Sequence, residues 1–147
     1  MPANTSPIYS LSGRFSSIAV TAANTSSQGG GTIATDIFLA FTPGANGSFV
    51  RNVVWVLSES TIATASTATV GRIFMSTVGS GATTSSNTYL IAEVALVSQT
   101  PSSSLAGVPI VIPLNIIVPS GYFLLATNHA VPVANTKWNA NVFGGDY

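Results

Sequence analysis

A stretch of twenty residues without a charge, from Pro109 to Asn128 (PIVIPLNIIVPSGYFLLATN), restricts more than any other feature how this chain can fold. Its length matches the ~20 apolar residues that a membrane-spanning helix requires. Pro109, Pro113 and Pro119 argue against a helix, because each removes a backbone donor and disfavours helical geometry in the residue before it. The stretch therefore predicts two short strands, at 110–118 and 122–127, and not a membrane span.

The two expected strands are joined by Pro119, Ser120 and Gly121, which are typical turn residues. Proline cannot donate a hydrogen bond to a neighbouring strand and is therefore confined to edge strands, strand starts and bulges. The prolines of the first run consequently predict an edge strand or a bulge.

Most of the remaining chain repeats this pattern of short apolar runs between turns rich in Gly, Pro, Asn and Ser. Further strands are expected at 16–22, 33–41, 49–57, 69–78, 88–97 and 137–143. Alternation places Ile33, Ile37, Leu39 and Phe41 on one face of the strand at 33–41. It places Phe49, Val53, Trp55 and Leu57 on one face of the strand at 49–57, and Trp138 and Val142 on one face of the strand at 137–143. About eight evenly spaced strands predict an all-β fold, an antiparallel β-sandwich of jelly-roll type. A length of 147 residues predicts one domain, at 15–147, preceded by an extended arm at 1–14.

Charged residues make up only 5% of the chain, against roughly 25% in an ordinary soluble domain. Twenty serines and 17 threonines account for a quarter of the residues, and the net charge is zero. A soluble monomer normally carries a well-charged surface. The composition therefore favours a protein whose surface is largely covered by other protein. A β domain kept soluble by its hydroxyl groups is the alternative.

The charges that do occur are placed inside apolar strands. Asp36, Arg51, Arg72 and Glu93 pair across strands or across subunits on one interpretation, and point outward into water on the other. The expected strand at 88–97 is apolar on both faces apart from Glu93. Such a strand contacts another subunit, or it is a central strand covered by a loop.

The residue types needed for catalysis or metal binding are nearly absent. The chain has no cysteine and one histidine, His129, which follows a strand in a polar turn and is expected at the surface. The carboxylates show no spacing that favours a pair, the Gln28–Thr32 run (QGGGT) lacks the ending of a phosphate loop, and four scattered cations form no basic patch. We therefore expect no enzyme, no cofactor, no metal site and no nucleic-acid binding. The first ten residues, MPANTSPIYS, have no basic or apolar region, so no secretory signal is expected.

The C-terminal third carries a specific pattern. The apolar run VPIVIPLNIIVPSGYFLLATN is followed by a short polar link and by KWNANVFGGDY at the chain end. This pattern, over about residues 108–147, resembles small structural proteins of tailed bacteriophages. In these proteins an apolar strand, a Pro-x-Gly turn and a C-terminal strand that ends in a GGDY-like sequence close a β-sandwich.

Within that group the resemblance implies a head decoration, or cement, protein. Such a protein is located on the capsid surface of the virion, where it holds neighbouring major capsid subunits together, and it is often a homotrimer. The first nine residues, MPANTSPIY, contain two prolines and are either an extended arm that reaches onto a neighbour or a disordered tail. Interface residues are expected at Pro2, Pro7, Ile8, Tyr9, Arg51, Arg72, Glu93 and Tyr147. A phage tail or fibre module that binds host carbohydrate is the alternative. It would use exposed aromatic residues, for which Tyr89, Tyr122, Trp138 and Tyr147 are the candidates.

Overall fold

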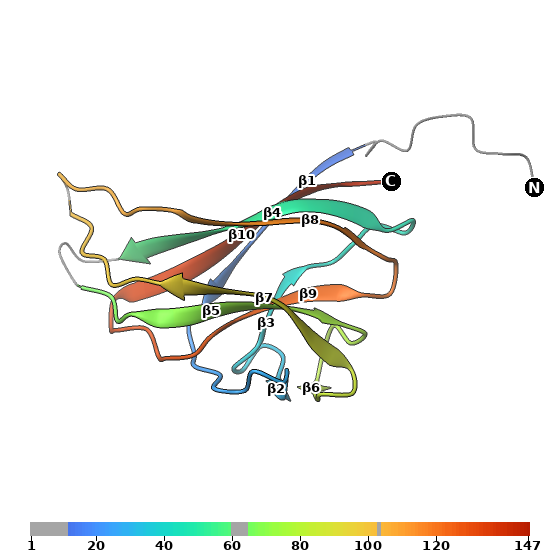
Figure 1. Cartoon of the computed structure of the whole chain (residues 1–147), viewed down its shortest axis with the longest axis horizontal. Coiled ribbons are helices and arrows are strands. Elements are labelled where there is room, and N and C mark those ends of the chain that lie inside the picture. Colours follow the sequence, from blue (N-terminus) through green and yellow to red (C-terminus); the bar gives the residue numbers. More distant parts are fainter. Residues whose placement is uncertain (1–11, 60–64, 103) are drawn as a thin grey trace, which may run out of the picture.

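The computed structural model describes residues 12–59, 65–102 and 104–147. Its strands are β1 (Ser12–Val20), β2 (Gly31–Thr32), β3 (Phe38–Phe41), β4 (Ser48–Glu59), β5 (Thr69–Ser76), β6 (Ala82–Thr83), β7 (Thr88–Leu96), β8 (Ile110–Val118), β9 (Phe123–Asn128) and β10 (Thr136–Asp146). Eight of them form two four-stranded antiparallel sheets that lie face to face (Figure 1). Sheet A has the order β1-β10-β4-β8, and sheet B has the order β3-β9-β5-β7. The predicted all-β sandwich is confirmed.

The strand pairs are nested along the chain. β5 pairs with β7, β4 with β8, β3 with β9 and β1 with β10, so each later pair encloses the one before it. The outermost pair brings the two ends of the described chain together, because Ser12 lies opposite Asp146 (Figure 1). The short strands β2 and β6 pair only with each other.

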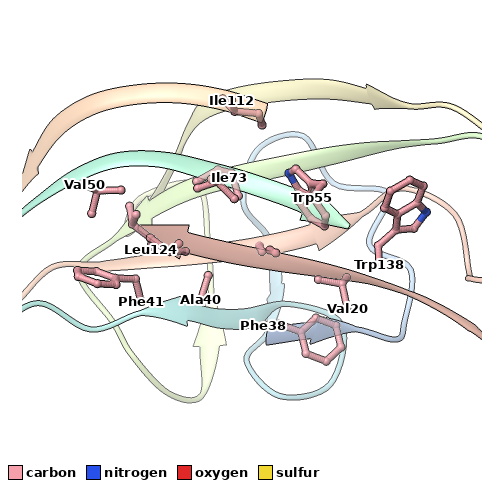
Figure 2. Packing of buried hydrophobic residues seen from close by; sticks show 14 of the residues in the cluster. Val20, Phe38, Ala40, Phe41, Val50, Trp55, Ile73, Ile112, Leu124 and Trp138 are labelled. Carbon is pink, nitrogen blue, oxygen red and sulfur yellow. The ribbon is translucent and has the colours of Figure 1, made fainter. Parts of the chain in front are cut away.

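The core lies between the two sheets and is filled by alternate residues of each strand (Figure 2). In sheet A, Val20, Trp138 and Leu57 form one buried row across three strands. Trp55 and Trp138 are the two largest fully buried side chains. Burial of a large apolar side chain stabilises a fold by about 1.5–3 kcal/mol, so this row is a main source of stability.

A second, smaller core covers the outer face of sheet B. Ile37, Phe74 and Leu125 are fully buried there, and Ile33, Leu39 and Phe123 pack against them. Ile33 and Ile37 belong to the segment between β1 and β3, which folds back over sheet B. Sheet B is therefore packed on both faces in this region.

The uncharged stretch forms the strands β8 and β9. β8 is an edge strand, as its prolines predicted, and β9 is an interior strand of the other sheet. The register between β4 and β8 shifts between Val50 and Asn52, which places a bulge beside Pro113. Gly121 has a φ of 82° in the turn between the two strands, and the Tyr122 amide donates to the Pro119 carbonyl over 3.1 Å. None of the described segments forms a helix that could cross a membrane.

Bulges overturn two of the predicted strand faces. In the run at 33–41, the strand β3 begins only at Phe38. A register shift between Leu39 and Phe41 directs the side chain of Phe41 into the main core, whereas that of Ile37 lies in the smaller core. In β4, the shift after Val50 directs Val50 inward instead of Phe49. β7 is an edge strand and not a central one. β1 begins at Ser12, so residues 12–14 of the predicted arm belong to sheet A, and the rest of the predicted arm lies outside the described residues.

Candidate interaction surfaces

The outer face of sheet A is not covered by any other described strand (Figure 1). We name it the open face, and the register assigns to it three rows of side chains that alternate with the buried rows. The first row is Phe15, Phe143, Asn52 and Pro113; the second is Ser17, Asn141, Val54 and Val111; the third is Ala19, Asn139 and Val56.

These three rows contain no charged residue. Two asparagine side chains of β10 lie in the middle of the open face. Asn141 donates to the Val54 carbonyl over 3.1 Å, and Asn139 donates to the Ser58 hydroxyl over 2.8 Å. Because these amides are bonded within the sheet, their orientation is fixed. The three rows thus present apolar and neutral polar groups to the outside, and the next row adds one charge, Lys137, which is exposed and lies opposite Ser58.

Large apolar side chains lie at both margins of the open face. Phe15 is 61% exposed and contacts Phe143, with ring centroids 5.2 Å apart and the planes at 50°. On the opposite margin, Val111 and Ile117 of β8 are 52% and 59% exposed. Exposed apolar groups gathered on one face mark an interaction site more strongly than single ones do.

A second group of exposed apolar side chains lies in the loops at one end of the sandwich. Val97, Leu105 and Val108 belong to the β7–β8 connection, and Val131 belongs to the β9–β10 connection. Both connections lie at the end opposite the chain termini (Figure 1). Gln99 holds the first loop in shape, since its side chain accepts from and donates to the backbone of Val108 over 2.7 and 2.9 Å.

Arg72 and Glu93, which were predicted as interface residues, form an ion pair within the chain. The Arg72 Nε lies 2.6 Å from Glu93 Oε1, across the β5–β7 ladder. Arg72 is buried and also donates to the Asn24 carbonyl over 3.3 Å, and its Nη1 lies 3.4 Å from Nδ1 of the exposed His129. Of the alternatives left open by the sequence, pairing across strands is therefore correct for these two residues.

The other predicted interface residues are scattered. Arg51 is exposed on β4 at the bulge, and the described residues offer it no side-chain hydrogen bond. Tyr147 is the last residue and lies at the end of the sandwich opposite the loops that carry the exposed apolar side chains. Its amide donates to the Gly47 carbonyl over 3.2 Å. Pro2, Pro7, Ile8 and Tyr9 lie outside the described residues.

The chain end is fixed by a cluster that sequence reasoning missed. Asp146 accepts from the Ser48 hydroxyl and from Arg14, whose Nη1 lies 2.7 Å from the carboxylate. The hydrogen bond from Ser48 is the main cause that lowers the pKa of Asp146, with burial acting in the opposite direction and the charge of Arg14 adding to the decrease. The only sequence signal for this cluster is the pair of charges near the two ends of the chain.

An open hollow of about 500 Å³ lies at one end of sheet A, lined by Thr21, Ser58, Glu59, Asn135, Thr136 and Lys137. It contains no aromatic side chain on which a sugar ring could stack. Among the candidate aromatics, Trp138 is buried in the core, and the Tyr89 hydroxyl donates to the Ser86 carbonyl over 2.7 Å. Within the described residues no group of His, Cys, Asp and Glu could hold a metal ion.

Comparison with known proteins adds no relative. No protein-family model, no curated protein and no solved structure matches this chain.

Proposed function

We propose that this chain is a non-enzymatic structural protein that binds the outside of a bacteriophage capsid and holds neighbouring major capsid subunits together. The observation that carries the proposal is the open face of sheet A, whose three rows are neutral and partly apolar and are not covered by any described strand. Its chemistry suits a protein partner whose own surface is neutral, because the three rows carry no charge that would attract nucleic acid or a charged surface.

The size of the open face limits what it can bind alone. Four strands about 4.8 Å apart, over three rows that span about six residues at 3.3 Å each, cover roughly 380 Å². A standard protein interface buries about 800 Å² on each partner, so the open face supplies about half of one. The exposed apolar side chains of the loop end offer a second contact, and two contacts on different subunits are what a protein that links neighbours requires.

The strand order supports the jelly-roll form of the sandwich. Numbered along the chain without β2 and β6, the long strands follow the order 1-8-3-6 in sheet A and 2-7-4-5 in sheet B. We infer a jelly roll from these nested pairs. That architecture occurs in viral shell proteins and in lectins. It therefore suits both the decoration protein and the carbohydrate-binding tail module, but the second has less support because the aromatic side chains do not line the hollow.

The test is co-sedimentation of the purified protein with capsids that lack it. We expect Val111→Glu, which places a charge on the open face, to weaken binding at least tenfold. Tyr89→Glu is the matched control, because Tyr89 is 51% exposed on β7, outside that face, and Val111 is 52% exposed. Binding that is unaffected by Val111→Glu would contradict the proposal, and glycan-dependent binding lost with Tyr89→Glu would favour the tail module.

A further inference from the structure

The two sheets end in four edge strands, and three of these carry features that hinder pairing with another strand. β8 contains Pro113 and, two residues later, Asn115 with a φ of 50°. β7 has a register shift opposite Ile73 and Phe74 and exposes Glu93. β3 is only four residues long and is interrupted by a bulge. Prolines, bulges, charges and short length are the usual means by which edge strands avoid association.

The fourth edge strand, β1, has no proline and no bulge and is not short. Its nine residues pair with β10 in unbroken register from Ser12 to Val20 and include no proline. Its one charged side chain, Arg14, is paired with Asp146 of the same chain. Against the described residues, the β1 backbone bonds only to β10, apart from the Val20 carbonyl, which accepts from Asn128 over 3.3 Å. One side of β1 therefore presents a row of free donors and acceptors.

We propose that β1 pairs with β1 of a second copy of this chain, antiparallel about a two-fold axis, so that two sheets A form one continuous sheet. The strand is complementary to itself. With Ser16 on the axis, all nine residues find a partner: Phe15 lies opposite Ser17, and Arg14 lies opposite Ile18 of the second copy. Residues of the open face then meet residues of the open face, and no like charges meet.

The pairing has a consequence for binding. It joins two open faces side by side into one surface of about twice the area, and two linked contacts bind more strongly than one. The two-fold pair differs from the trimer that the phage resemblance implies. It also does not depend on the proposed function, since the unprotected edge is present whatever the chain binds.

Single-cysteine variants test the pairing, because the native chain contains no cysteine that could complicate the result. Residues opposite each other in antiparallel strands lie about 4.5–5.5 Å apart at Cα, within the range that a disulfide spans. We expect light scattering to give twice the chain mass of 15.0 kDa, and mild oxidation to cross-link Ser16→Cys. Ser17→Cys reports the pairing with Ser17 on the axis, in which the register is shifted by two residues. Ala95→Cys, exposed on the edge strand β7, is the control that stays monomeric on a denaturing gel.

A charge variant gives an independent measurement. Ser17→Lys places two ammonium groups on one face of the paired strands, so we expect the dissociation constant of the dimer to rise at least tenfold, while Ala95→Lys leaves it unchanged. A mass of 15.0 kDa at every concentration, a trimeric mass, or cross-linking at Ala95 as fast as at Ser16 would overturn the inference. A dimer that does not bind capsids would support the β1 pairing and contradict the proposed function. A monomer that binds capsids would contradict the pairing and support the proposed function.

Discussion

Phe15 and Phe143 form an aromatic pair across β1 and β10, with their ring centroids 5.2 Å apart on the open face. Both rings are substantially exposed, so the fold gains little from them, and an aromatic pair contributes only about 0.5–1.5 kcal/mol beyond burial. We therefore expect Phe143→Ser to lower the free energy of unfolding by about 1 kcal/mol and to weaken capsid binding at least tenfold. Urea unfolding and co-sedimentation measure the two effects.

Tyr122→Ser is the control for this variant, because Tyr122 is also partly exposed but lies in the β8–β9 turn, away from the three rows of the open face. Capsid binding should not change in that variant. A Phe143→Ser protein that binds as the native chain does would show that the aromatic pair is not part of the contact.

The ion pair between Arg72 and Glu93 gives a stability prediction. Arg72 is buried and its partner is 44% exposed, so removal of the carboxylate leaves a buried cation with only backbone and imidazole contacts. We expect Glu93→Gln to lower the free energy of unfolding by about 1–2 kcal/mol, less than for a fully buried pair because water screens Glu93. Denaturant unfolding measures the difference.

Arg51→Gln is the matched control for this prediction, since it removes the charge of an exposed side chain without a partner among the described residues. Its effect should lie within about 0.5 kcal/mol. Equal losses in the two variants would mean that the Arg72–Glu93 contact contributes nothing specific to the fold.

The sequence predicted strands more reliably than it predicted faces. β8 was located to the residue, because Pro109 and Pro119 bound it and exclude a helix. Alternation failed where a strand has an extra residue, as at Val50 in β4 and between Leu39 and Phe41 in β3. A bulge changes the face of the sheet to which every later side chain in the strand points. No residue type in these two runs predicts a bulge.

The candidate surfaces required long-range information. In β10, Asn139 and Asn141 alternate with Trp138, Ala140 and Val142, a pattern that indicates one polar and one apolar face. That the outer faces of β1 and β10 adjoin, and that β4 and β8 extend them with valines, depends on the strand order. The pairing of Arg72 with Glu93 likewise depends on β5 and β7 being neighbours, which composition and spacing do not determine.

Gly144 explains part of the GGDY sequence at the chain end. The register between β10 and β4 shifts between Phe143 and Gly144, and a Cβ at Gly144 would collide with the Phe49 carbonyl oxygen. Because that oxygen belongs to the backbone of a central strand, it cannot move aside. We expect Gly144→Ala to lower the free energy of unfolding by about 3 kcal/mol, as measured by urea unfolding.

Gly13→Ala provides the comparison for Gly144→Ala. Gly13 lies two strands away from Phe49, and a Cβ there would meet no atom within 4 Å. That variant should differ from the native chain by less than about 0.5 kcal/mol. If both alanine variants were equally stable, close backbone approach would not be the reason for glycine at position 144.

Asp146 makes the stability of the chain depend on acid pH. Its folded pKa lies below the ordinary value of 3.8, mainly because the Ser48 hydroxyl donates to the carboxylate. The unfolded chain therefore binds the proton more readily, so the contribution of Asp146 to stability is fully present above about pH 4 and is lost as the pH falls through the lower folded pKa.

Urea unfolding between pH 2 and pH 7 should show the native chain more stable than Asp146→Asn at neutral pH, with the difference shrinking below pH 4. Ser48→Ala removes the main cause of the lowered pKa, so its loss of stability in acid should begin at the same pH, which the unfolded chain sets, but should be smaller and end at a higher pH. A difference between the native chain and Asp146→Asn that stays constant down to pH 2 would contradict this account, because it would mean that the carboxylate charge does not matter at the chain end.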